Sequence, residues 1–359
     1  MVLGRWSSLK ESMKFDYDGK IPFSNLSDQW INGPAVKMFE DDYARFCEAK
    51  YCVGCSSGTA AIHLALLSIR TKPGDEVITV PNTFVGTIEP VVYTGASIKF
   101  VDVMSDTALM NIDLLEKAIT KKTKAVIVVD LYGQMPDMQR IKEIGDKHGV
   151  YIIEDACQAH GALWNGHPPG HYSDFACYSF YPSKNLGCHG DGGAVTTNDI
   201  WFEKEMRMFL DHGRKDKHVH RYVGYNYRLD TIQAEVLDMK LKGLSAEIDK
   251  KRIIARFYDK HIPDHIIEDV NAKHAYHQYV IRVKQRERVI EFLFNKGIGT
   301  GVHYPIPLHL QPAYGFLGFK EGCFPVSEQL ASEVVSIPVW PGMTRQQCVH
   351  VVRSIKEVS

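Results

Sequence analysis

The sequence predicts an α/β protein whose core is a mainly parallel β-sheet covered by helices. Short runs rich in β-branched residues, each bounded by turn or polar residues, predict buried strands at residues 77–80, 98–101, 125–129 and 150–153. Segments with helical patterning separate these runs, at residues 60–69, 114–119 and 138–147. Because this alternation is typical of parallel sheets, one α/β domain is expected here.

Chain length and the later pattern predict a second, smaller lobe. At 359 residues the chain exceeds the size at which one hydrophobic core usually keeps growing. Apolar residues at helical spacing predict a long connecting helix within residues 229–262. Strand and helix patterns alternate again beyond it, at residues 278–283, 286–294 and 345–355. We therefore predict a tail, a large domain and a small α/β domain, at residues 1–20, 21–245 and 246–359.

Composition and charge argue against several classes of protein. The formal net charge is -1 and no Lys/Arg-rich run is present, so nucleic acid is not expected as a partner. Residues 1–18 lack the continuous apolar core of a signal peptide, and no stretch is long and apolar enough to span a bilayer. We therefore expect a cytoplasmic protein that does not enter a membrane.

The cysteines predict reduced thiols and no metal site. The chain has 8 cysteines without the paired spacing of a disulfide framework. Cys52 and Cys55 resemble half of a metal or redox motif, but a second pair is missing. Since a structural zinc site needs four ligands, no metal is predicted.

A loop of small residues at positions 55–61 is the first segment that could carry chemistry. It leads directly into a helix and includes Ser57, Gly58 and Thr59. Such a junction presents free backbone N–H groups and the positive end of a helix dipole to an anion. An ordinary N-cap by Ser57 or Thr59 explains the same residues, and for this segment alone it is the simpler interpretation.

Carboxylates follow the strand at residues 150–153. Asp155 stands at its carboxyl end, where open α/β sheets bind ligands, so it is well placed to meet a cation. A buried aspartate that caps the next turn is the alternative, and for a single aspartate it is the commoner case. Gln158 and His160 are equally compatible with packing and with ligand binding.

One lysine stands in the aromatic, half-polar segment 178–187. A lysine among apolar groups has a lowered pKa and becomes a nucleophilic amine, which imine formation requires. Lys184 is therefore a candidate nucleophile, although most lysines simply lie at the surface. The glycines that follow it indicate tight turns or a close approach of backbone.

Taken in order, these motifs resemble those of the sugar aminotransferases of the DegT/DnrJ/EryC1/StrS family. The resemblance extends over about residues 33–352, and its most specific pieces are residues 56–61, 154–161, 179–186, 190–193, 224–228 and 303–312. It implies the pyridoxal-phosphate (PLP)-dependent transferase fold type I, similar to aspartate aminotransferase. That fold has a large domain with a mainly parallel, mixed seven-stranded sheet between helices, and a smaller C-terminal α/β domain.

The resemblance also implies a role for each residue of a PLP site. Lys184 would hold the cofactor as a Schiff base and then shuttle protons, and Asp155 would pair with the pyridinium nitrogen. Phe84 would stack on the cofactor ring, and Gln158 would bond its phenolic oxygen. The phosphate would be held by Gly58, Thr59 and Ser179 of the same subunit, and Ser57 would be a further cofactor-binding residue. Asn226 would reach the phosphate from the neighbouring subunit of a homodimer.

Two positions depart from the family pattern. Asp130 and Ser183 stand where the family often has His and Gly. Neither change removes a group that imine chemistry requires, although Asp130 leaves the local polarity open. A related branch has His in place of the lysine and dehydrates sugars, and Lys184 argues against that branch.

For the substrate, the resemblance identifies weaker candidates. The segment 303–312 is similar to the one that lines the family's sugar site, and its candidates are His303, Tyr304, His309 and Gln311. Three basic residues could neutralise a diphosphate or could be ordinary solvated surface: Arg214, Lys215 and Lys217. Arg228 is a candidate for the amino donor's carboxylate, since a guanidinium binds a carboxylate in a bidentate manner.

The reaction that this resemblance implies is transfer of an amino group from L-glutamate, or from glutamine, to a keto group of a deoxy sugar linked to dTDP, UDP or GDP. The segment 303–312 slightly favours amination at the third carbon over the fourth. A keto-cyclitol acceptor is an alternative. A relative that binds PLP without catalysis is another, and the retained Lys184, Asp155 and Gln158 argue against it.

Overall fold

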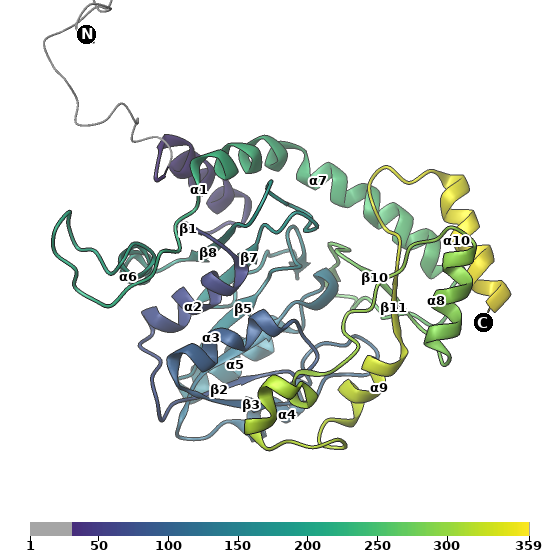
Figure 1. Cartoon of the computed structure of the whole chain (residues 1–359), viewed down its shortest axis with the longest axis horizontal. Helices are drawn as coiled ribbons and strands as arrows, with labels where there is room; N and C mark the ends of the chain where they lie inside the picture. Colours follow the sequence, from purple (N-terminus) through teal and green to yellow (C-terminus); the bar gives the residue numbers. More distant parts are fainter. Residues whose placement is uncertain (1–30, 359) are drawn as a thin grey trace, which may run out of the picture.

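The structure, a computed structural model, describes residues 31–358 (Figure 1). The predicted tail at residues 1–20 lies outside the described residues. A central twisted sheet occupies the middle of the molecule, helices cover it, and a long helix runs along one side toward a C-terminal group of strands and helices (Figure 1).

The central sheet has seven strands in the order β1-β8-β7-β5-β4-β2-β3. Their bounds are β1 (Tyr51–Cys55), β2 (Glu76–Thr79), β3 (Ser97–Phe100), β4 (Thr123–Val129), β5 (Tyr151–Asp155), β7 (Phe175–Ser179) and β8 (Gly193–Thr197). Only β8 runs against its neighbours in this sheet, because it pairs antiparallel with both β1 and β7. This mixed, mainly parallel seven-stranded sheet confirms the predicted fold class.

The middle strands form because both of their faces are buried. Along β4, Val126 and Val128 pack into one apolar cluster, whereas Ala125 and Ile127 pack into another on the opposite face. Since neighbouring residues of a strand point to opposite faces, a continuous apolar run is what a two-sided core requires. The covering helices and short turns are α1 (Pro34–Phe46), α2 (Gly58–Ser68), η1 (Val85–Thr87), α3 (Glu89–Thr94), α4 (Ile112–Ala118), η2 (Leu131–Gly133), α5 (Met138–His148) and α6 (Ile200–Leu210).

The predicted connecting helix is α7 (Thr231–Asp259). Beyond it a third apolar cluster joins the end of α7 to later helices and strands, and it includes Tyr258, Leu293 and Val352. The remaining elements are β6 (Leu163–Trp164), β9 (Ala272–Lys273), β10 (Tyr279–Arg282), α8 (Arg286–Asn295), η3 (Leu308–Leu310), η4 (Pro312–Leu317), α9 (Pro325–Glu333), β11 (Val334–Ile337) and α10 (Arg345–Val358). The domain boundary proposed at 245/246 falls inside α7, which continues through it, so this division remains a prediction.

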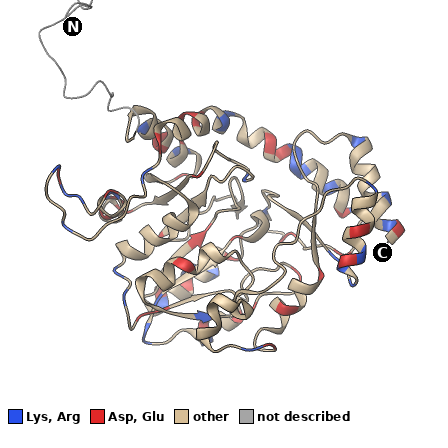
Figure 2. Cartoon of the chain, in the orientation of Figure 1, with Lys and Arg blue, Asp and Glu red and all other residues tan. Residues whose placement is uncertain are grey.

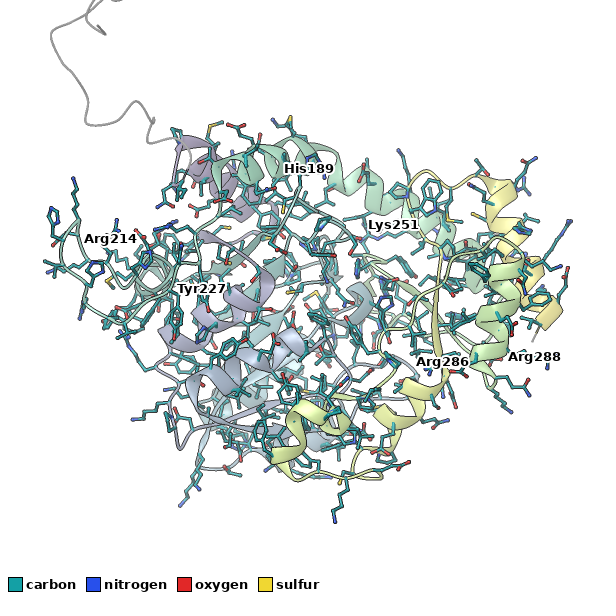
Figure 3. All side chains as sticks on the ribbon, viewed as in Figure 1. His189, Arg214, Tyr227, Lys251, Arg286 and Arg288 are labelled. Atoms are coloured by element: carbon teal, nitrogen blue, oxygen red, sulfur yellow. The ribbon has the colours of Figure 1, made fainter. Side chains whose placement is uncertain are left out.

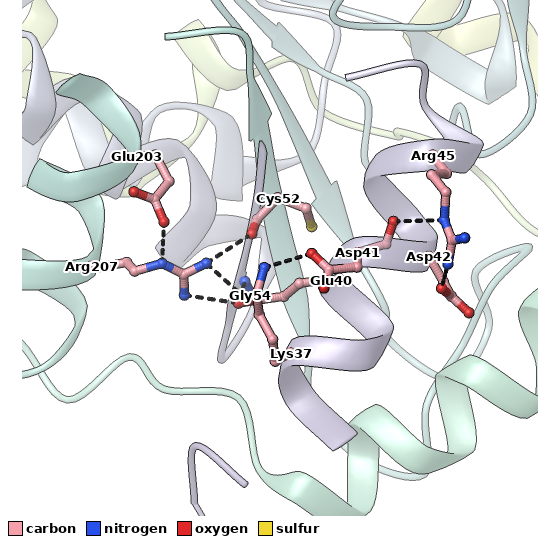
Figure 4. Close-up of polar contacts among 9 residues, drawn as sticks. All are labelled: Lys37, Glu40, Asp41, Asp42, Arg45, Cys52, Gly54, Glu203 and Arg207. Carbon is pink, nitrogen blue, oxygen red and sulfur yellow. Dashed lines mark hydrogen bonds and ion pairs between the residues drawn. The ribbon is translucent and has the colours of Figure 1, made fainter. Parts of the chain in front are cut away.

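A buried carboxylate fastens α1 to the edge of the sheet (Figure 4). Glu40 is 2% exposed and accepts hydrogen bonds from the Gly54 backbone N–H at 2.8 Å and from Arg207 Nη2 at 2.9 Å. Arg207 of α6 also bonds Glu203 and donates to the Cys52 carbonyl oxygen at 3.2 Å. A buried charge needs such partners, so this network fixes α1, β1 and α6 relative to one another.

Charged groups are distributed over the helices and outer loops (Figure 2). No helix between residues 31 and 358 has the length and apolar character needed to cross a membrane. Within the same residues, no group of three or more His, Cys, Asp or Glu side chains is arranged to hold a metal ion.

Candidate active site

A cavity of about 540 Å³ opens where the carboxyl ends of β4, β5 and β7 meet. Its walls contain every cofactor residue predicted for the same subunit, namely Ser57, Gly58, Thr59, Phe84, Asp155, Gln158, Ser179 and Lys184. In parallel sheets this edge is the common ligand site. The structure thus brings together residues that are up to 127 positions apart along the chain.

One end of the cavity is formed by the start of α2. The Ser57 side chain accepts a hydrogen bond from the Ala60 N–H at 3.1 Å, so Ser57 is both an N-cap and a cavity residue. Gly58 must be a glycine, because a Cβ there would lie 2.6 Å from Cys157 Sγ and 2.8 Å from Ser179 Cβ. The first N–H groups of a helix have no partner within the helix, so this end of the cavity suits an anion such as a phosphate.

Asp155 lies across the cavity wall at the end of β5, and its carboxylate is held from two sides. Thr87 Oγ1 donates to Oδ2 at 2.6 Å, and the Cys157 N–H donates to Oδ1 at 3.3 Å. The side chain of Thr83 bonds that of Thr87 at 2.8 Å, which orients the donor in turn. Only 7% of Asp155 is exposed, so the carboxylate is fixed and mostly shielded from water.

Lys184 lies in the loop after β7 and is half-buried in the cavity wall. Its backbone N–H donates to the Tyr181 carbonyl oxygen at 2.9 Å. The loop turns tightly, because a Cβ on Gly187 would stand 2.5 Å from the Pro182 carbonyl oxygen. Lys184, the predicted nucleophile, thus lies in the wall of this cavity.

The histidines around Lys184 are held in the neutral form. Burial, together with the nearby Lys184 charge, lowers the pKa of His160 to about 3 and the pKa of His277 well below its usual value. The same two causes lower the pKa of His303. These rings therefore add no positive charge next to Lys184 at neutral pH.

Gln158 forms hydrogen bonds with residues from two different segments of the chain. Its Oε1 accepts from the Tyr132 N–H at 2.7 Å, and its Nε2 donates to Tyr304 Oη at 3.2 Å. The rings of Phe84 and Tyr304 lie 5.8 Å apart, and Phe84 is 56% exposed. The two rings can thus cover a flat group that enters the cavity.

Asp130, the departure noted in the sequence, lies at the end of β4 and also lines the cavity. Burial and the neighbouring Glu154 and Asp155 raise the pKa of its carboxyl well above its usual value. Burial among these carboxyl groups therefore favours the neutral form of Asp130. Sequence reasoning had left this polarity open.

Some cavity residues were not among the site residues predicted from the sequence. They are Thr83, Gly86, Thr87, Tyr181, His277 and Gln278, together with Ile62 and Val129. Thr87 acts through a 3-10 turn that packs on a strand 68 positions later, and no local pattern indicates this contact. His277 and Gln278 come from a segment that reaches the cavity only after the chain has passed through α7.

Of the predicted substrate residues, His303 and Tyr304 line the cavity. His309 does not line it, because its side chain is buried against Phe324 and its Nε2 lies 2.9 Å from Glu328 Oε1. Gln311 donates to the Ile306 carbonyl oxygen at 3.4 Å and is likewise absent from the cavity wall. For these two residues, contact with the sugar remains a prediction.

The other substrate residues lie on the segment between α6 and α7, outside the cavity of their own subunit. Part of this segment projects from the molecule, and Figure 3 labels Arg214 on it. Arg228 Nη1 bonds Asp211 Oδ1 at 2.5 Å, and Arg214 Nη1 lies 3.5 Å from Asp211 Oδ2. Lys215, Lys217 and Asn226 are exposed. This chain alone therefore brings none of these groups to Lys184.

Comparison with protein families gives one match that spans most of the chain. Residues 23–356 match the model of the DegT/DnrJ/EryC1/StrS aminotransferase family. The UDP-2-acetamido-2-deoxy-3-oxo-D-glucuronate aminotransferase of Pseudomonas aeruginosa is 42% identical over 317 residues, which are 87% of this chain and 88% of that protein. The dTDP-3-amino-3,4,6-trideoxy-alpha-D-glucose transaminase of Streptomyces venezuelae is 36% identical over 352 residues, with 97% and 93% of the two chains covered.

Solved structures agree with the sequence matches. DesV of S. venezuelae, in complex with a ketimine intermediate, has a TM-score of 0.90 and 37% identity, with 92% of this chain and 91% of that chain covered. The PLP form of the putative sugar aminotransferase Spr1654 from Streptococcus pneumoniae has a TM-score of 0.87 and 26% identity, with 92% and 93% covered.

Proposed function

Because the chain belongs to the DegT/DnrJ/EryC1/StrS aminotransferase family, we propose that it aminates a keto sugar linked to a nucleotide. It is a PLP-dependent sugar aminotransferase with an α/β fold. The observation that carries the proposal is the cavity itself, which holds Lys184, Asp155 and the start of α2 together. An amine, a fixed carboxylate and an anion-binding helix end are the groups that PLP requires of a protein.

The residues of the cavity fit PLP at each of its polar groups. The start of α2, with Gly58, Thr59 and Ser57, and Ser179 beside it, suit the phosphate. Asp155, fixed by Thr87, suits the pyridine nitrogen. When bound, PLP supplies an electron sink for the carbon that loses its proton.

The side chains then have separate tasks. The Lys184 amine would hold the cofactor and, when not bonded to it, would serve as the base that takes up a proton and the acid that returns it. Asp155 would pair with the ring nitrogen and keep it protonated. Phe84 and Tyr304 would cover the cofactor and shield it from water. Gln158 donates a hydrogen bond to Tyr304 and would also bond the cofactor's phenolic oxygen.

For the amino acceptor, we propose a deoxy sugar carried by dTDP, UDP or GDP, with the keto group at the third carbon slightly favoured. The two named relatives above act on sugars linked to UDP and to dTDP, and both names place the nitrogen or the keto group at position 3. His303 and Tyr304 would contact the sugar, since they lie in the cavity beside Lys184. The proposed donor is L-glutamate, or glutamine, with Arg228 as a candidate for its carboxylate.

We propose a homodimer with shared sites, working in the cytoplasm. Asn226 is exposed and outside its own cavity, which fits a contact with the partner's cofactor phosphate. Val219 and Val223 of the same segment are 51% and 90% exposed. Apolar side chains exposed to that extent on one segment favour burial against a second protein surface.

The experiment that tests the function is a substrate panel. Purified protein with PLP, glutamate and each nucleotide keto sugar should convert glutamate to 2-oxoglutarate and yield an amino sugar detectable by mass spectrometry. Lys184→Ala should abolish this conversion, because no other lysine among residues 31–358 lines the cavity.

The controls separate the alternatives. Borohydride should fix the cofactor to Lys184, and recovery of the label on another lysine by peptide mapping would contradict the assignment. Conversion with a keto-cyclitol but with no nucleotide sugar would favour the cyclitol alternative. Cofactor binding without any conversion of glutamate would favour a protein that only binds PLP.

A further inference from the structure

The loop that carries Lys184 is fastened to the long helix α7 at three successive points. Gln233 Oε1 accepts from the His189 N–H at 2.9 Å, and Lys240 Nζ donates to the Gly187 carbonyl oxygen at 2.5 Å. Lys251 Nζ donates to Asn185 Oδ1 at 2.7 Å, and Asn185 is the residue that follows Lys184. Figure 3 shows His189 and Lys251 along the same side of α7.

The spacing of these helix residues explains how one helix makes all three contacts. Lys240 and Lys251 follow Gln233 by seven and eighteen positions, which are close to whole numbers of helical turns. The three side chains therefore lie in one stripe along α7. In order along α7, these side chains contact residues 189, 187 and 185 of the loop.

Lys251 differs from Lys240 in its surroundings. Lys240 is an exposed residue, whereas Lys251 is half-buried and donates to two neutral oxygens, Asn185 Oδ1 and, at 3.3 Å, the Tyr276 carbonyl oxygen. Asn185 in turn donates from Nδ2 to the Ala275 carbonyl oxygen at 2.8 Å. Lys251 and Asn185 thus join α7, the Lys184 loop and the segment 275–278, which also lines the cavity.

We propose that Lys251 is a positioning residue for Lys184: its ammonium group, through Asn185, sets the place of the Lys184 loop against α7 and the cavity wall. The proposal rests on the function proposed above and adds to it a residue outside the cavity. A cation is well suited to this role, because a hydrogen bond from a charged donor is stronger than one from a neutral donor.

The charge of Lys251 changes near pH 8. Burial lowers the pKa of Lys251 to about 8, and Glu247 on the same helix opposes this shift. Lys251 also interacts electrostatically with His160, His274 and His277 of other elements, and burial lowers the pKa of each of these histidines. Below pH 8 the ammonium form makes the bond to Asn185, and above pH 8 the weaker neutral amine replaces it.

The test compares Lys251→Met with Lys250→Met in the full-length enzyme with its cofactor. Lys250 is the exposed neighbour on α7, so its variant removes the same charge without touching the loop. Lys251→Met should speed hydrogen exchange at the backbone amides of residues 184–188, read by mass spectrometry. It should also slow the glutamate half-reaction about tenfold at pH 7, because small displacements of a reacting group are costly.

The pH dependence separates positioning by the ammonium group from simple packing. The ratio of the wild-type rate to the Lys251→Met rate should fall as pH rises from 7 to 9.5, because the wild type then loses the charge. Lys251→Arg, which stays protonated, should keep most of the wild-type rate at both values. Lys250→Met should match the wild type in exchange and in rate.

Unchanged exchange in Lys251→Met, or a rate ratio that is the same at pH 7 and pH 9.5, would overturn the proposal. If Lys251→Met does not fold, Asn185→Ala removes the acceptor instead and should give the same loss of exchange protection. If the wild-type enzyme shows the expected protection from hydrogen exchange but does not react with glutamate, the proposed function is wrong. That result would not contradict the contact between Lys251 and the Lys184 loop.

Discussion

The two sides of the cavity are built in different ways. On the cofactor side, Asp155 and Ser179 end neighbouring strands of one sheet, and Gly58 begins the helix that packs on them. On the substrate side, His303 and Tyr304 come from an irregular loop, and the basic segment between α6 and α7 lies away from its own cavity. Strand ends are fixed by ladders of hydrogen bonds and by two buried faces, whereas loops can vary without loss of the fold.

The two sides of the cavity also differ in how their carboxylates are bound. Asp155 is buried, and two donors of the same chain fix it. Asp211, in the basic segment, is only half-buried and is shared by Arg214 and Arg228. Variants on the cofactor side therefore test chemistry, and variants on the other side test assembly and substrate choice.

The largest effect is expected for Asp155 on the cofactor side. Asp155→Ala should lower turnover at saturating substrates by about a hundredfold or more. The variant lacks the fixed carboxylate that would stabilise the protonated ring nitrogen of the cofactor. Cofactor binding, read by absorbance, should change far less. The matched control is Asp130→Asn, which replaces a carboxyl with a strongly raised pKa in the same wall by a neutral amide and should have a much smaller effect. Equal turnover of Asp155→Ala and the wild type would refute the role of this carboxylate.

The next effect concerns Asn226 and tests the shared site directly. Lys184→Ala and Asn226→Ala subunits should each be impaired when pure. In a mixed dimer both lesions fall in one site and the other site is intact, so activity should reappear after subunit exchange. The measurement is the rate of 2-oxoglutarate formation before and after mixing.

Both variants must remain dimers by sedimentation for this comparison to hold. No recovery in demonstrated hybrid dimers would return Asn226 to a role in its own turn, since asparagine suits turn geometry well.

The difference between strand ends and loops also explains which site residues the sequence could predict. Lys184 and Asp155 were predictable because each belongs to a short motif at the end of one strand. Thr87 was not, because its bond to Asp155 arises only when a 3-10 turn packs on β5. His309 was named by its motif, but its orientation depends on Glu328 of α9, a contact that no local pattern shows.

The smallest effect is expected for the basic segment. Lys215→Ala together with Lys217→Ala should raise the KM for a nucleotide keto sugar about two- to fivefold at low salt and leave kcat unchanged, since exposed charges mainly attract a charged ligand. The KM for glutamate should stay constant, and added salt should reduce the difference. Lys121 and Lys122, which are also exposed and lie in the turn before β4, give a matched double variant that should have no effect. An unchanged KM at low salt would leave Lys215 and Lys217 as solvated surface, and an equal rise in both KM values would indicate damage to the loop instead of loss of a diphosphate contact.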